Sequence, residues 1–141
     1  MPEIASRLPP APVAPPQRLC ASDELIEKGK AIVFDVLHYR EPARAFAMRF
    51  DGKVVAYLNR CVHVPTELDW QPGEFLDSGK EFILCSIHGA AYEPRSGACI
   101  GGPCGRGKLT LIPLEERNGE VWWLPTAATA PAPPGSTSSV V

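Results

Sequence analysis

Short apolar runs separated by turn residues fill the middle of the chain, and they predict strands rather than helices. Residues 31–37 are rich in β-formers, and in the run 44–50 the large apolar side chains fall at every second position. Asp51-Gly52 then favours positive φ, and the apolar run 54–58 follows. This pattern is typical of a β-hairpin, and its second strand leads directly into Asn59-Arg60.

The second half of the chain continues the pattern. Residues 82–84 and 90–92 are brief apolar runs, and an Asn118-Gly119 turn joins the runs 109–114 and 120–124. Counting all runs gives about seven strands and almost no helix. The sequence therefore predicts an all-β fold, an antiparallel sandwich or small barrel.

The two ends of the chain differ from this middle part. Residues 1–19 hold six prolines, which lack an N–H and restrict φ, so we expect an extended, disordered arm. Residues 125–141 carry no charged side chain and are mostly Pro, Ala, Ser and Thr, which predicts a second disordered tail. The folded domain is expected to span residues 20–124.

Composition excludes several classes of function. A chain of 141 residues with a net charge of −2 is one domain without a basic surface, so nucleic acid is not an expected partner. No apolar run approaches the roughly 18 residues that span a bilayer, and the proline-rich start does not resemble a secretory signal. We therefore expect a soluble, cytoplasmic protein without a membrane partner.

Two short segments carry paired metal-ligand residues: Cys61-Val62-His63, and Cys85-Ser86-Ile87-His88-Gly89. Two cysteines and two histidines are able to close a structural zinc site, and this alternative stays open. Zinc motifs usually pair like with like, however, whereas here each segment offers one thiolate and one imidazole. That alternation favours a cluster with two unlike irons, in which thiolates bind one iron and imidazoles bind the other.

The motif Cys61-x-His63 with Cys85-x-x-His88-Gly89 resembles the signature of the Rieske ferredoxin family. The resemblance continues through Tyr92, Gly97, Gly102-Pro103 and Leu109, and it covers most of the chain. It implies one [2Fe-2S] cluster per chain, held in a small lobe of loops at one end of the β-sandwich. It also implies a role for each site residue: Cys61 and Cys85 bind the buried iron, His63 and His88 bind the outer iron, and Tyr92, Gly89, Gly102 and Pro103 surround and tune the cluster.

Three positions depart from the high-potential respiratory members of that family. Thr66 and Ile87 stand where those proteins have two cysteines joined as a disulfide, and Ala90 replaces a serine whose hydroxyl bonds to a cluster sulfur. Tyr92 keeps the second hydroxyl. Because hydrogen bonds to the sulfurs favour the reduced cluster, we expect a potential in the lower half of the Rieske range of about −150 to +300 mV.

Three further cysteines and one histidine are unassigned. We interpret Cys20, Cys99 and Cys104 as ordinary thiols of a reducing compartment, with a Cys99–Cys104 disulfide as the alternative. His38 is interpreted as structural. A mononuclear iron site needs two histidines and a carboxylate, and one free histidine cannot supply it, so no catalytic centre is expected.

The resemblance therefore implies a one-electron carrier, similar to the ferredoxin component of a multicomponent oxygenase system. A flavoprotein or other reductase would be its electron donor, and a terminal oxygenase or reductase its acceptor. Two alternatives stay open: a small Rieske subunit of a reductase similar to nitrite reductase, and a structural zinc module used for binding.

Overall fold

The computed structural model describes residues 14–62, 66–69, 71, 73–85, 89–103, 105–126 and 128–131. Within them the chain forms short antiparallel strands and one turn of 3-10 helix, so the all-β prediction is confirmed. The elements in chain order are β1 (Gln17–Ala21), η1 (Ser22–Glu24), β2 (Ile32–His38), β3 (Glu41–Phe50), β4 (Lys53–Leu58), β5 (Ile83–Leu84), β6 (Ala91–Tyr92), β7 (Cys99–Gly101), β8 (Leu114–Arg117) and β9 (Glu120–Trp123).

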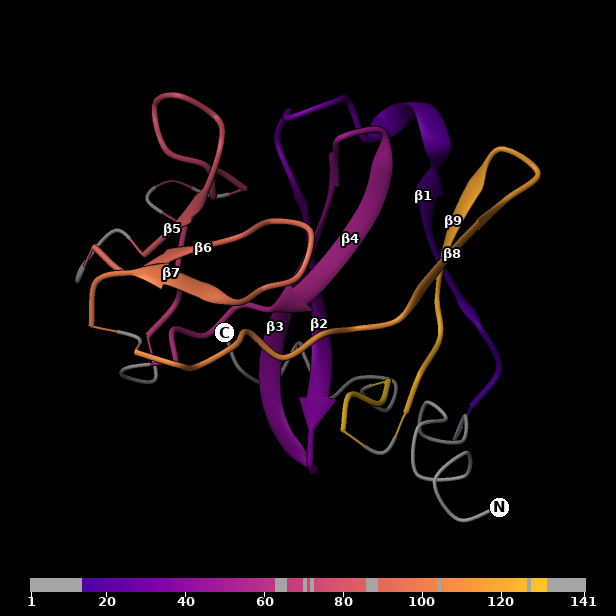
Figure 1. Cartoon of the computed structure of the whole chain (residues 1–141). Helices are drawn as coiled ribbons and strands as arrows, with labels where there is room; N and C mark the ends of the chain where they lie inside the picture. The colour runs from indigo at the N-terminus through magenta and orange to yellow at the C-terminus, as the bar shows by residue number, and fades with distance from the viewer. Residues whose placement is uncertain are drawn as a thin grey trace, which may run out of the picture.

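The strands form three sheets, which follow one another across the molecule in Figure 1. The central sheet has the order β2-β3-β4, and the outer sheet, on the right in the figure, has the order β1-β9-β8. The third sheet, β5-β6-β7, and the loops beside it form a lobe on the left.

Strand β3 is buried on both faces, and this places the central sheet between the other two. Phe46 and Met48 belong to the apolar core that the central sheet shares with the lobe. Ala45 and Ala47, on the opposite face, belong to the core shared with Val121 and the rest of the outer sheet. Successive side chains of a strand point to opposite faces, so the alternation of large and small residues gives each face its own partner.

Three two-residue turns close the hairpins β2–β3, β3–β4 and β8–β9, and two of these turns are predicted by the sequence. Asp51-Gly52 has φ values of 57° and 80°, and Asn118-Gly119 has 52° and 76°, which is the turn that suits the twist of a hairpin. The β2–β3 turn has the same form at Tyr39-Arg40, with φ values of 47° and 73°. Because neither residue favours positive φ, the sequence contains no local signal for this turn.

The prediction of a strand over 109–114 is corrected. Only Leu114 of that run lies in β8, and Leu111 forms one isolated bridge with Tyr57. The strand is displaced because the tight turn at Asn118-Gly119 pairs Leu114 with Trp123 and Arg117 with Glu120. The residues immediately before the turn are therefore the ones that join the ladder.

The packed part of the chain reaches further than residues 20–124 at both ends. Strand β1 begins at Gln17, where it pairs with Trp123. At the other end, Ala130 exchanges two backbone hydrogen bonds with Leu37, of 2.8 and 2.9 Å, so part of the segment expected as a tail lies along β2. Residues 1–13 and 132–141 of the predicted arm and tail lie outside the described residues.

Among the described residues, none of the helical structure is long and apolar enough to cross a lipid bilayer.

Candidate metal centre

Cys61 and Cys85 lie in one buried cluster at the base of the lobe. Cys61 follows the end of β4 by three residues, and Cys85 follows β5 directly. Their exposed fractions are 2% and 0%, both are reduced cysteines, and both belong to the core between the central sheet and the lobe. Two buried thiols are thus brought together from segments 24 residues apart in the sequence.

The backbone of each of these cysteines is hydrogen-bonded to a residue that follows it in the same segment. The N–H of Cys61 donates to the carbonyl of Thr66 at 2.8 Å. The N–H of Cys85 donates to the carbonyl of Ala90 at 2.8 Å, and the N–H of Gly89 donates back to Cys85 at 2.9 Å. In both segments the N–H of the cysteine therefore donates to the carbonyl of the residue five positions later.

The predicted imidazole ligands belong to these two segments of the sequence. His63 and the segment from Ser86 to His88 are outside the described residues, so the assignment of the four ligands stays a prediction. Among the residues that are described, no group of three or more His, Cys, Asp or Glu side chains is arranged to hold a metal ion.

Tyr92 connects strand β6 to the first of these cysteines. The residue is fully buried, and its hydroxyl lies 3.4 Å from the Sγ of Cys61 and accepts a hydrogen bond of 3.0 Å from the N–H of Val62. With an acceptor position occupied by Val62, the hydroxyl proton is available to the sulfur. Burial, followed by the hydrogen bond to Cys61, raises the pKa of the Tyr92 phenol well above its ordinary value, so the group is protonated at neutral pH.

The segment with Gly102 and Pro103, which the resemblance places around the cluster, packs against Gly89 and Ala90 through bare backbone. Gly102 has φ +83°, and a Cβ at this position would lie 2.8 Å from both the Cα of Ala90 and the carbonyl oxygen of Gly89. Gly89 also has positive φ, at 72°, and Pro103 is exposed. The backbone at Gly102 thus lies close to that of Gly89 and Ala90, and no residue other than glycine fits at Gly102 without movement.

The interpretation of the extra cysteines as ordinary thiols is wrong for Cys99 and confirmed for Cys20. Cys99, which pairs with Tyr92 across β6 and β7, is disulfide-bonded. Cys20 is a free thiol in the core of the outer sheet, where burial raises its pKa. Cys104 lies outside the described residues.

A polar pair at the start of the first loop was missed in the sequence. Asn59 is buried, with an exposed fraction of 5%, and it donates through Nδ2 to Asp69 Oδ1 at 3.1 Å while its Oδ1 accepts the N–H of Leu68 at 2.7 Å. The available signal was an amide residue at the end of an apolar strand and two positions before Cys61.

His38 has the structural role that was expected. Its Nδ1 lies 2.9 Å from the carbonyl oxygen of Ala128, and its ring packs 4.8 Å from that of Tyr39. It therefore helps to fasten the C-terminal segment to β2.

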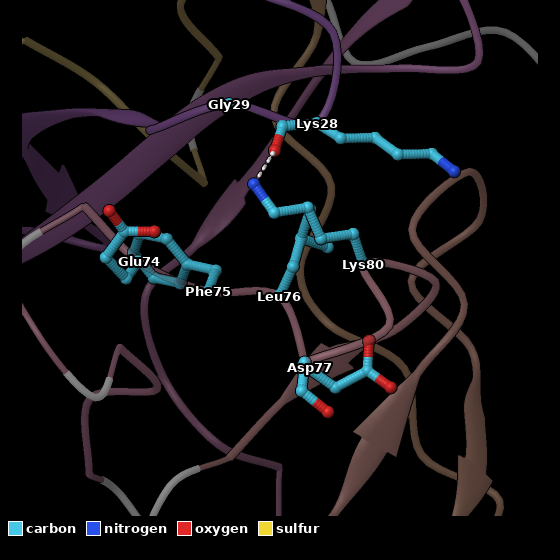
Figure 2. Close-up of a pocket in the computed structure, with 8 residues that line it drawn as sticks. Lys28, Gly29, Glu74, Phe75, Leu76, Asp77 and Lys80 are labelled. Carbon is cyan, nitrogen blue, oxygen red and sulfur yellow. Dashed lines mark hydrogen bonds between the residues drawn. The ribbon is translucent and has the colours of Figure 1, made fainter.

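A pocket of about 210 Å³ lies between the turn at Lys28 and the loop 74–80. Figure 2 shows the Nζ of Lys80 directed at the carbonyl oxygen of Lys28, to which it donates at 3.3 Å. Phe75 and Leu76 also line the pocket. None of the predicted site residues lines it.

The fold and the site together define a small β-protein with a pair of buried thiols at the starts of two matched loops. The model of the family described as Rieske [2Fe-2S] domain matches residues 16–127. The chain therefore belongs to the Rieske [2Fe-2S] domain family, and its cofactor is one [2Fe-2S] cluster. Family membership sets aside the alternative of a structural zinc module.

Solved structures support the same fold. The ferredoxin of carbazole 1,9a-dioxygenase from Nocardioides aromaticivorans IC177 is 21% identical, with a TM-score of 0.61 over 80% of this chain and 100% of that chain. A chain from the complex of reduced oxygenase and oxidized ferredoxin in carbazole 1,9a-dioxygenase is 20% identical, with a TM-score of 0.60 over 79% of this chain and 94% of that chain.

A larger protein contains the same fold as one part. The terminal oxygenase of carbazole 1,9a-dioxygenase from Novosphingobium sp. KA1 is 23% identical, with a TM-score of 0.59 over 86% of this chain and 33% of that chain. No curated protein sequence matches the chain.

Proposed function

We propose that the chain is a one-electron carrier that uses its Rieske [2Fe-2S] cluster as the ferredoxin component of a multicomponent oxygenase-type system. The observation that carries the proposal is the pair of buried thiols of Cys61 and Cys85, with the Tyr92 hydroxyl 3.4 Å from the first. Reduced cysteines that are buried together at the starts of two loops suit a shared metal centre, because the metal stabilises their thiolate form.

The ligand assignment follows from that pair and from the sequence motif. Cys61 and Cys85 would bind one iron as thiolates. His63 and His88, the motif partners in the same two segments, would bind the other iron. The cluster supplies a centre that accepts and donates one electron. The protein's own residues exclude water from the thiolates, direct the Tyr92 proton to the Cys61 sulfur, and hold Gly102, with Pro103 beside it, over the second loop.

The surroundings of the thiols support contact with a protein partner. Val62, next to Cys61, is 42% exposed. An apolar side chain exposed beside a ligand of the cluster suits short-lived association with another protein. A flavoprotein or other reductase as donor, a terminal oxygenase as acceptor, and a cytoplasmic location belong to this proposal.

The structural neighbours include both expected sides of such a system, a ferredoxin and a terminal oxygenase, and one of them is a complex of the two. These likenesses agree with a carrier that delivers electrons to an oxygenase. The small reductase subunit is the alternative outcome of the tests below.

The first test is the cluster itself. The purified protein should contain iron and acid-labile sulfide in equal amounts, and after reduction with dithionite its EPR spectrum should show an average g below that of all-cysteine clusters. C61A and C85A should lose the cluster, whereas C20A, which removes a buried thiol from the other core, should keep it. A spectrum of the all-cysteine type would contradict the ligand assignment.

The second test concerns the electron-transfer role. A flavoprotein reductase with NADH should reduce the protein in a stopped-flow experiment, and an oxygenase should reoxidise it without forming a lasting complex. Isolation only as a tight complex with a larger reductase would favour the subunit instead.

A further inference from the structure

The first cysteine loop is fastened at its base by a chain of side-chain hydrogen bonds. Asn59 Oδ1 accepts the Leu68 N–H at 2.7 Å, Asn59 Nδ2 donates to Asp69 Oδ1 at 3.1 Å, and Asp69 Oδ2 accepts the Gly73 N–H at 3.3 Å. The backbone N–H of Asn59 donates to the Arg44 carbonyl on β3 at 2.8 Å. We propose that Asn59 and Asp69 are positioning residues that set the geometry of the first cluster-binding loop; the proposal rests on the proposed function.

The orientation of the amide follows from its neighbours. The N–H of Leu68 is only a donor, so the Asn59 atom that faces it must be the oxygen, and the NH₂ group then faces the Asp69 carboxylate. An ionised carboxylate only accepts, and Asp69 receives one N–H on each of its two oxygens. All the groups in the chain of bonds are therefore matched donor to acceptor, with an amide in one position and a carboxylate in the other.

The residues that form these bonds lie on both sides of Cys61 in the sequence. Asn59 lies two residues before Cys61, and Leu68, with an exposed fraction of 0%, lies seven residues after it. The side-chain bond Asn59–Leu68 thus encloses the backbone bond between Cys61 and Thr66. Because the N–H of Asn59 donates to the Arg44 carbonyl on β3, the base of the loop is bonded to the central sheet.

If Asn59 and Asp69 had a purely structural role, particular hydrogen-bonding groups at these positions would not be required. Any well-packed residue at the end of β4 would stabilise the chain, whereas a positioning role needs both the acceptor toward Leu68 and the bond between residues 59 and 69. A buried polar group that loses its hydrogen-bond partner costs free energy, and two carboxylates in contact repel each other, so breaking the bond between residues 59 and 69 should open the loop locally before the framework unfolds.

The test exchanges the two side chains. In N59D two carboxylates face each other across the 3.1 Å contact, and the bond is lost. In the double variant N59D/D69N, the carboxylate at position 59 accepts from the Leu68 N–H and from the new amide at position 69. The oxygen of that amide accepts from the Gly73 N–H, so every hydrogen bond can be restored with the charge moved. N118D, in the exposed β8–β9 turn, is the matched control for an added carboxylate.

Three readouts on the iron-loaded protein separate the roles: hydrogen exchange of the peptide that contains Leu68, iron per chain, and the EPR line shape. We expect N59D to speed exchange at Leu68 by about tenfold or more, to lower iron per chain and to broaden the EPR signal. The double variant should regain the wild-type values, and N118D should not depart from them.

Two results would overturn the proposal. One is an N59D protein with the wild-type EPR line shape and iron content, even if its melting temperature falls, because the pair would then be structural only. The other is a double variant that folds but keeps the N59D spectrum. If N59D does not fold, the double variant N59D/D69N is compared with the single variant D69N by the same readouts. If the wild-type protein gives no Rieske EPR signal, the proposed function is overturned instead. If the wild-type protein gives this signal and the variants give the same line shape and iron content, only the positioning role is overturned.

Discussion

The central sheet and the lobe use different means to hold their shape. Strands β2, β3 and β4 are seven, ten and six residues long, whereas β5, β6 and β7 have two, two and three. The long strands are stabilised by continuous backbone ladders and by apolar side chains on both faces. The lobe has only short ladders, and beside the apolar core that it shares with the central sheet it uses single specific contacts: a tyrosine hydroxyl, a glycine against backbone, and a polar pair at its base.

A substitution should therefore have different effects in the central sheet and in the lobe. A ladder of many similar bonds tolerates the loss of one, because the neighbouring bonds hold the register. A loop held by a few specific contacts has no such reserve, so a local change there should alter the site before it alters global stability.

The contact between the central sheet and the lobe should be the part of the fold that is most sensitive to substitution. Phe46 on β3 is fully buried and stacks on Phe75 of the lobe, with ring centroids 3.8 Å apart. F46A should lower the free energy of unfolding by about 3–5 kcal/mol, measured by urea denaturation. F34A, on the half-buried opposite side near Trp123, should cost less. Equal losses of unfolding free energy in F46A and F34A would show that the contact between the central sheet and the lobe is no more important than the contact with the outer sheet.

Gly102 should be essential to the lobe but not to the framework. G102A combines an unfavourable positive φ with a Cβ 2.8 Å from the backbone of Ala90, so we expect a loss of about 2–4 kcal/mol together with loss of bound iron. Gly119 has a similar φ of 76°, but nothing lies within 4 Å of its Cβ position. G119A therefore measures the conformational strain alone, about 1–2 kcal/mol.

Iron content separates these two glycine variants. G119A should keep the cluster, because the turn that it strains belongs to the outer sheet. A G102A protein with full iron would contradict the importance of the contact between the loops.

The Tyr92 hydroxyl should tune the cluster without holding the fold. Y92F removes the donor to the Cys61 sulfur, and a hydrogen bond to a charged acceptor is worth about 1.5–3 kcal/mol. For a one-electron couple this corresponds to a potential lower by about 60–130 mV. Y57F is the matched control, because its buried hydroxyl donates to the Pro94 carbonyl at 2.7 Å rather than to a thiol. Protein-film voltammetry should show no comparable shift for Y57F, and an unchanged potential in Y92F would refute the tuning role.

The smallest effect is expected where an ion pair links two sheets. Arg49 on β3 donates to Glu116 on β8 at 2.6 Å, and this hydrogen bond lowers the pKa of the Glu116 carboxyl. E116Q should lose about 1 kcal/mol at pH 7. E115Q, which removes a more exposed pair of 3.6 Å with Arg117, should have almost no effect.

The pH dependence gives the sign of this contribution. A carboxyl whose pKa is lowered by folding stabilises the protein above its unfolded pKa, and this stabilisation is lost as the pH falls toward the folded value. The difference between wild type and E116Q should therefore be greatest at neutral pH and disappear below about pH 4. A difference that grows in acid would contradict the assignment.

Local preferences explain what could be predicted for the framework. The alternation of large apolar residues in 44–50, the Asp51-Gly52 turn and the Asn118-Gly119 turn each depend on residues that are neighbours in the chain. The turn at Tyr39-Arg40 carries no such signal. There the antiparallel register from Ile32–Ala47 to His38–Glu41 leaves only two residues for the turn and so imposes their positive φ.

For the candidate site, the amino-acid sequence alone gives the spacing of the two cysteine motifs, the absence of a cysteine at Thr66, and a tyrosine at position 92. Tertiary packing places the two thiols in one buried core and brings the Tyr92 hydroxyl to Cys61. It also decided the disulfide bonding of Cys99, the contact of Gly102 with Ala90, and the bonds of Asn59 to Leu68 and Asp69. The local features are predictable because residue identity encodes local conformation and chemistry. Contacts between loops depend instead on how distant strands pair, and no local pattern records that pairing.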